Sequence, residues 1–150
     1  MGAVLQRVAS ASVTVDGAVI SEISRGLMVL VGIGTDDTIA NIEVLTNKIL
    51  QIHVFDDPAT GSMWKQSAKD INGDVLCVSQ FMLFANTHKG NKPDFHRTTA
   101  THLYQKSKEI YALFLERMGK IYKPEKIKGQ PAHGKFGAMM NVSLTNEVRD

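Results

Sequence analysis

The sequence predicts a single α+β domain over residues 1–150. Segments with strand character come first, two segments with helical periodicity are interspersed among further strands, and a pattern of period two closes the chain. A chain of 150 residues has the usual length of one domain and can bury roughly 70% of its unfolded surface. We therefore expect one compact fold with antiparallel or mixed sheets and two main helices.

The first third of the chain is predicted to form strands. Four valines mark two short β-prone segments: Val4, Val8, Val13 and Val15. Asp16 and Gly17 then predict a tight turn into a strand over about residues 19–23. The run over residues 27–33 is apolar on both faces, which is typical of a central strand.

Two amphipathic helices are predicted. Over residues 38–50 apolar side chains recur every three or four positions, and the acidic residues at positions 36–37 can cap the helix start. The same periodicity predicts a second helix over about residues 99–118. Gly119 and Pro124 are expected to end that helix.

Strand character returns in three further segments. Residues 52–55 resume a β-prone pattern, and a turn at residues 72–73 announces a buried strand over residues 74–81. Near the end of the chain three apolar residues alternate with polar ones: Met140, Val142 and Leu144. This period of two predicts a strand with one buried face, which one small domain cannot easily cover alone.

Composition limits the class of function. No stretch approaches the ~18 apolar residues that span a bilayer, and the N-terminus lacks an apolar signal core, so we expect a cytoplasmic protein without a membrane segment. The lone Cys77 lies in an apolar run and should pack in the core. A net charge of +2 is too balanced for nonspecific coating of nucleic acid. Lysines do gather near residues 88–92 and 120–135, where they either face RNA or are simply solvated.

Polar residues at the end of the buried strand are the first candidates for chemistry. Ser79 and Gln80 stand where a rigid scaffold can aim donors at a ligand, although ordinary turn residues look the same. No motif ties a histidine to Ser79, which favours a preformed hole for negative charge over a serine nucleophile. The histidines have no metal-ligand spacing and no dinucleotide fingerprint is complete, so we expect neither a metal nor a cofactor.

Four short motifs carry a family resemblance: Leu5-Gln6-Arg7-Val8, Ser79-Gln80-Phe81-Met82-Leu83, Lys92-Pro93-Asp94-Phe95-His96 and Phe136-Gly137-Ala138-Met139-Met140. Together they resemble the D-aminoacyl-tRNA deacylase family, which hydrolyses the ester between a D-amino acid and tRNA. The resemblance implies a barrel-like sheet arrangement around helices. It also implies a homodimer whose two active sites lie at the subunit interface.

The resemblance assigns roles to residues of this chain. Backbone amides at Ser79, Gln80, Phe81 and Met82 are expected to polarise the ester carbonyl, while the terminal 2′-hydroxyl of the tRNA helps to activate water. Arg7 is expected to support a Gly-Pro turn that binds the substrate amino group. The remaining residues expected at the substrate or the tRNA acceptor end are Lys89, Lys92, Phe95, His96, Phe136, Gly137, Ala138 and Asn146.

Two motif positions differ from the family pattern. Met82 stands where the family has threonine, and Val148-Arg149 stand where it has Gly-Pro. A non-proline cis peptide costs ~2.5–4 kcal/mol, so the turn that excludes L-amino acids is not expected here. We therefore expect slow hydrolysis with weak selectivity for the D-form. The alternative is a catalytically impaired isoform, or a truncated form, that acts as a nucleic-acid-binding dimer.

Overall fold

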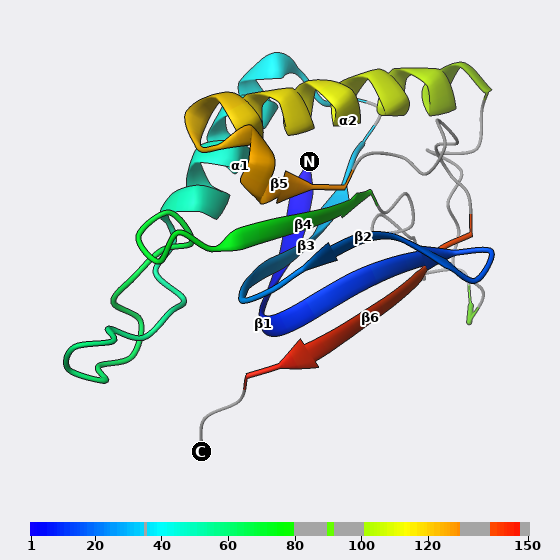
Figure 1. The fold of residues 1–150 in the computed structure, drawn as a ribbon. Coiled ribbons are helices and arrows are strands. Elements are labelled where there is room, and N and C mark those ends of the chain that lie inside the picture. Colours follow the sequence, from blue (N-terminus) through cyan, green and yellow to red (C-terminus); the bar gives the residue numbers. More distant parts are fainter. Residues whose placement is uncertain (35, 80–89, 92–100, 130–138, 148–150) are drawn as a thin grey trace.

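The fold is built on one mixed sheet of six strands (Figure 1). The structure is a computed structural model that describes residues 1–34, 36–79, 90–91, 101–129 and 139–147. Its strands are β1 Gly2–Val15, β2 Ala18–Ile23, β3 Gly26–Gly32, β4 Asp74–Ser79, β5 Ile127–Lys128 and β6 Asn141–Asn146. The strand order is β2-β1-β3-β4-β5, with β6 also paired to β1. Pairs that involve β1 are antiparallel, whereas β3, β4 and β5 run parallel to one another.

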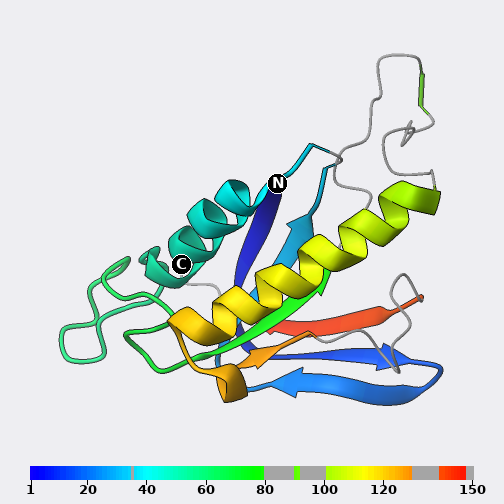
Figure 2. The ribbon, with the colours of Figure 1, turned by 90° about the horizontal axis from the view of Figure 1, so that it is seen from above.

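Two helices cover one face of this sheet (Figure 2). They are α1, Ile39–Gln51, and α2, Thr101–Ile121, and a short 3₁₀ helix, η2, follows at Pro124–Lys126. The predicted α+β class is confirmed, with a nearly closed, barrel-like mixed sheet and two main helices in one compact domain.

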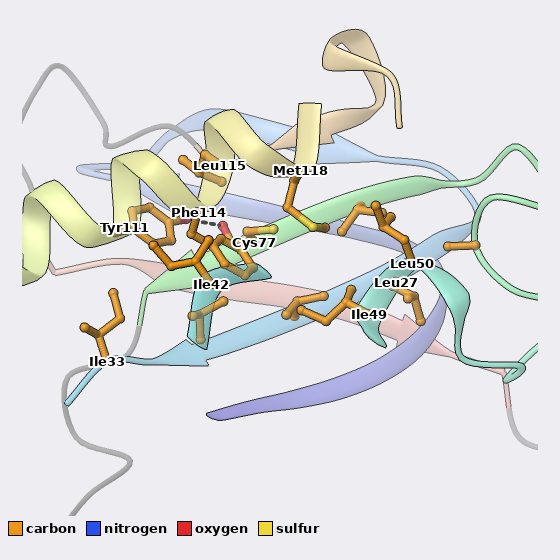
Figure 3. Packing of buried hydrophobic residues seen from close by; sticks show 14 of the residues in the cluster. Leu27, Ile33, Ile42, Ile49, Leu50, Cys77, Tyr111, Phe114, Leu115 and Met118 are labelled. Atoms are coloured by element: carbon orange, nitrogen blue, oxygen red, sulfur yellow. Dashed lines mark hydrogen bonds between the residues drawn. The ribbon is translucent and has the colours of Figure 1, made fainter. Parts of the chain in front are cut away.

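The core is divided between the two faces of the sheet. Beneath the helices, Leu27 and Cys77 pack against Phe114 and Met118 of α2 (Figure 3). A smaller cluster on the opposite face contains Val8, Val13, Met28, Leu76 and Val78, with Val142 of β6 packed on it. Cys77 is 2% exposed, as its apolar context predicted.

The first strand is longer than predicted. The two expected segments form one strand, β1, whose first half pairs with β3 and whose second half pairs with both β2 and β6. A register shift between Val13 and Thr14 lets the strand continue along β2. The predicted turn at Asp16 and Gly17 is confirmed, since both have positive φ values of 50° and 78°.

Three local predictions were wrong. Residues 52–55 form no strand and keep only an isolated bridge between Phe55 and Gln66. The N-cap of α1 is Thr38, whose N–H donates to Asn41 Oδ1 at 2.8 Å. Helix α2 continues through Gly119 and ends at Ile121.

Asp37 bonds to the chain terminus and to a turn, and it does not cap the helix. Its carboxylate pairs with the buried Met1 ammonium group and accepts a hydrogen bond from the Gly34 N–H at 2.6 Å. The N-cap position of α1 is taken by Thr38, so the Asp37 carboxylate bonds the terminus and the preceding turn instead. This explains why the acidic pair at positions 36–37 was a misleading capping signal.

The last strand is less buried than its pattern predicted. Val142 is partly buried, but Leu144 is 36% exposed. The alternation of β6 therefore points an apolar side chain toward solvent in the single chain. Among the described helices, none is long and apolar enough to cross a membrane.

Candidate active site

Strand β4 carries Ser79 to the edge of the core. Residues 75–78 of β4 are buried, and β3 flanks the strand in parallel with Ser79 opposite Val31. Its last residue, Ser79, is only partly buried. The structure thus confirms a buried strand that reaches Ser79, and the last two residues of the predicted strand, 80–81, lie outside the described residues.

Much of the predicted site lies outside the described residues. These positions are Gln80, Phe81, Met82, Lys89, Lys92, Phe95, His96, Phe136, Gly137 and Ala138, together with Val148 and Arg149. Their roles stay predictions. The described members of the predicted set are Arg7, Ser79 and Asn146.

Arg7 holds three separate segments together. Its Nη1 donates to the Val54 carbonyl at 3.1 Å and lies 3.5 Å from Asp56 Oδ1, and its Nη2 donates to the Glu147 carbonyl at 3.2 Å. The side chain is 18% exposed. A planar guanidinium suits this task because its donors point in fixed directions. Arg7 therefore binds the backbone carbonyl of Glu147, the residue just before Val148.

A pocket of about 280 Å³ adjoins this arginine. Its lining residues are Leu5, Gln6, Arg7, Leu27, Val54, Trp64, Asn146 and Glu147. The Arg7 guanidinium carbon lies 5.9 Å from the centre of the Trp64 ring, and Trp64 is 58% exposed. The structure therefore brings Arg7 and Asn146 to one pocket, with Trp64 at its rim.

Sequence reasoning did not connect Trp64 to this pocket. Trp64 is mostly exposed, so it does not belong to the core. Its φ of +60° is unusual for a bulky side chain. No spacing in the sequence links residues 7 and 64.

Within one chain, Ser79 and Arg7 lie at opposite ends of the sheet. Arg7 is opposite Leu27, which is opposite Val75 at the start of β4. Ser79 is opposite Val31, four residues further along β4 (79 − 75 = 4). At about 3.3 Å per residue, this separates the two by roughly 13 Å along the strands. A single chain does not combine them in one pocket.

The two ionisable side chains that lie at β4 near Ser79 are uncharged at neutral pH. Burial raises the pKa of the Cys77 thiol to about 12, so this sulfur remains protonated and is no nucleophile at neutral pH. Burial also raises the pKa of Tyr111, whose hydroxyl faces the same strand, well above its usual value. Within the described ranges, no group of three His, Cys, Asp or Glu residues could hold a metal ion.

Comparisons of the sequence with a family model and with curated proteins point to the same family. A family model described as D-Tyr-tRNA(Tyr) deacylase matches residues 4–147. The D-aminoacyl-tRNA deacylase of Saccharomyces cerevisiae is 47% identical over 147 residues, which cover 98% of this chain and 93% of that protein. The D-aminoacyl-tRNA deacylase of Dictyostelium discoideum is 48% identical, with 98% of this chain and 92% of that protein covered.

Solved structures agree with the fold. The structure of the c-Myc DNA Unwinding Element Binding Protein is 46% identical, with a TM-score of 0.86, over 97% of this chain and 91% of that one. A probable eukaryotic D-amino acid tRNA deacylase matches with a TM-score of 0.75 at 17% identity, covering 97% and 93% of the two chains, which supports the fold alone. On the sequence matches, this chain belongs to the D-Tyr-tRNA(Tyr) deacylase family.

Proposed function

We propose that this chain hydrolyses the ester bond of aminoacyl-tRNA whose acyl group is a D-amino acid or glycine. The reaction frees tRNA for translation and serves as quality control in the cytoplasm. Family membership over residues 4–147 supports the reaction class. The structural observation that carries the proposal is the buried strand β4, which leads to Ser79, the first residue of the predicted motif.

The proposed chemistry uses backbone amides and not a side-chain nucleophile. Water adds to the ester carbonyl carbon, the oxyanion is held by amides that follow β4, and the bond to the ribose 3′-oxygen then breaks. The terminal 2′-hydroxyl of the tRNA helps to activate the water. Such a hole stabilises charge only if its donors are fixed before reaction, and the pairing of β4 with β3 up to Ser79 supports that rigidity.

A homodimer would bring the two halves of the site together. Ser79 and the pocket of Arg7 and Asn146 are at opposite ends of one sheet, so a second copy placed end to end could join them. The exposed apolar side chain of Leu144 in β6 also supports a dimer, because a second copy could cover it. Light scattering should then give twice the chain mass of 16.5 kDa at micromolar concentration. A mass of 16.5 kDa would contradict the shared site.

Lysines are proposed to hold the acceptor end of the tRNA. Lys89 and Lys92 belong to a basic cluster that precedes the Phe95-His96 motif, and lysine serves there as a charge for phosphates, not as a reader of bases. Phe136, Gly137 and Ala138 are proposed to lie beside the ester, at the partner side of the pocket.

The direct experiment is a deacylation time course on D-tyrosyl-tRNA and L-tyrosyl-tRNA. We expect hydrolysis of the D-form above the rate in buffer. Ser79→Ala should keep most of this activity, because it preserves the backbone amide, whereas loss of a true serine nucleophile costs ~10⁶ in kcat. Binding of tRNA with no turnover of either ester would instead favour the nucleic-acid-binding alternative.

Two variants test the positions that differ from the family pattern. Met82→Thr should raise the rate for both esters, since one lost oxyanion donor typically costs ~10²–10³ in rate. Val148→Gly combined with Arg149→Pro should instead raise the ratio of D-form to L-form hydrolysis. Strong D-selectivity of the unmodified chain would refute this assignment of the selectivity.

A further inference from the structure

The hydroxyl group of Tyr111 lies between two strands at the end that leads to the proposed site. This tyrosine belongs to α2, is 2% exposed and stacks on Phe114 with ring centres 6.4 Å apart (Figure 3). Its hydroxyl oxygen lies 3.0 Å from the Cys77 carbonyl oxygen and 2.8 Å from that of Gly129. The helix therefore contacts the backbone of two different segments through one atom.

These two carbonyls lie where β4 and β5 separate. The parallel pairing of β4 with β5 ends at Leu76 and Lys128. Cys77 and Gly129 are the residues that follow this last pair. A Cβ atom on Gly129 would lie 2.2 Å from the Cys77 carbonyl oxygen and 3.0 Å from the Tyr111 hydroxyl. The backbones thus approach closely at the point where strand pairing stops, and only a glycine with a φ of +132° fits there.

The chemistry of the hydroxyl suits a link between two acceptors. A tyrosine hydroxyl has one proton, which it can share between two carbonyl oxygens or pass from one to the other. Burial raises the pKa of Tyr111 well above its usual value, so the proton is retained across the neutral range. Removing this hydroxyl therefore removes one hydrogen bond to each of the two segments.

Each of the two segments continues toward a predicted part of the site. Ser79 follows Cys77 by two residues, and the chain after Gly129 leads to the Phe136-Gly137-Ala138 motif. We propose that Tyr111 is a positioning residue for deacylation, whose hydroxyl fixes the segment that ends in Ser79 relative to the segment that starts at Gly129. This inference rests on the proposed function of the β4 end. It gives a role to a residue that lies outside every motif of the family resemblance.

The same helix offers a matched control. The Tyr122 hydroxyl donates to the Gly73 carbonyl at 2.7 Å, just before the other end of β4. Tyr122 directly follows α2 and joins it to a backbone carbonyl at the start of β4, which is the end away from Ser79. Removing either hydroxyl therefore breaks a similar bond in a different place.

The kinetic test compares Tyr111→Phe with Tyr122→Phe in the full chain, using D-tyrosyl-tRNA. Because misplacement of a reacting group by about 1 Å can cost ~10²-fold, Tyr111→Phe should lower kcat about 10- to 100-fold and leave KM unchanged. Tyr122→Phe should keep kcat within about twofold, even where both variants lower Tm alike. Equal kcat values for Tyr111→Phe and the unmodified chain would overturn the inference, as would equal losses in both variants.

Amide hydrogen exchange separates this inference from the proposed function, because it needs no turnover. Tyr111→Phe should speed exchange at Ser79 and in the segment after Gly129 by about tenfold, whereas Tyr122→Phe should speed exchange near Gly73. If the unmodified chain shows no hydrolysis of D-tyrosyl-tRNA, the proposed function fails and this role in deacylation fails with it. If the chain is active but exchange at Ser79 does not change in Tyr111→Phe, only the positioning role is refuted.

Discussion

The two ends of β4 are held by the same two kinds of contact, a tyrosine hydrogen bond and a close approach at a glycine, but their surroundings differ. At each end a tyrosine from the α2 region donates to a backbone carbonyl, Tyr122 to Gly73 and Tyr111 to Cys77. At each end a glycine also lets two backbones approach. A Cβ on Gly26 would lie 1.8 Å from the Asp74 carbonyl oxygen, just as one on Gly129 would meet Cys77.

The surroundings of the two ends differ. At the start of β4, the Asp74 carboxylate accepts the Ser24 N–H at 3.1 Å and pairs with Lys126 at 3.3 Å. At the far end, Tyr111 is buried and binds the strand through neutral groups, and the chain runs on into the predicted motif of Ser79. The comparison teaches that similar contacts can anchor a fold at one end and position a site at the other. Stability should respond alike at both ends, whereas the positioning of Ser79 should respond at the far end.

The largest effect is expected from the two close glycines. Gly26→Ala and Gly129→Ala should each lower the free energy of unfolding by about 3 kcal/mol or more, since the new methyl group meets rigid backbone. Urea unfolding measures this loss. Gly2→Ala is the matched control, because a Cβ there meets nothing within 4 Å.

Activity at permissive temperature distinguishes the two glycine variants. For any folded fraction, the rate of D-tyrosyl-tRNA hydrolysis per folded molecule should fall much more in Gly129→Ala, which lies beside Cys77, than in Gly26→Ala. A comparable loss per folded molecule in both would end the distinction between an anchoring end and a positioning end.

The next largest effect is expected at alkaline pH, where the buried thiol of Cys77 should lower the free energy of unfolding. Burial raises the pKa of Cys77 from 9.0 to about 12, so the unfolded chain loses this proton first. The stability contributed by the neutral thiol is complete below pH 9 and is lost as pH rises toward 12. Cys77→Ala should abolish about 1 kcal/mol of the decline in unfolding free energy between pH 9 and about pH 10. An identical pH profile for the variant would show that the thiol is not buried in solution.

The smallest effect is expected from the ion pair at the start of β4. Lys126→Met should cost about 0.5 kcal/mol, less at high salt, because its partner Asp74 is only partly buried. It should leave deacylation unchanged. Lys120→Met, which breaks an exposed pair with Glu116 on α2, is the control and should cost less. A loss of activity in Lys126→Met would show that the start of β4 also contributes to the site.

The sequence predicted those parts of the fold that depend on local pattern. The apolar run before Ser79 identified β4 and the burial of Cys77, and the apolar periodicity identified both helices. Residues 52–55 were mistaken for a strand because their local sequence does not reveal that, among the described residues, they pair only through the bridge between Phe55 and Gln66. Local propensity alone does not decide such short segments.

The contacts that organise the site connect distant parts of the chain. Arg7 meets Glu147 across 140 positions, and Tyr111 meets Cys77 across 34. A strand-edge arginine or a helical tyrosine has no local signature of its partner, so pattern analysis could name Arg7 only through the family resemblance and did not identify Tyr111. The sheet register was also needed to show that Ser79 and Arg7 lie apart in one chain.

The most direct test of the account is where the substrate binds. The probe is adenosine that carries D-tyrosine at its 3′ position through an amide, which cannot be hydrolysed as the ester is. Backbone NMR of the full chain should show amide shifts at Ser79 and at Glu147, since a shared site in a dimer joins those two ends. Shifts confined to the start of β4, or to Glu147 without Ser79, would contradict the assignment of the far end of β4 as the active site.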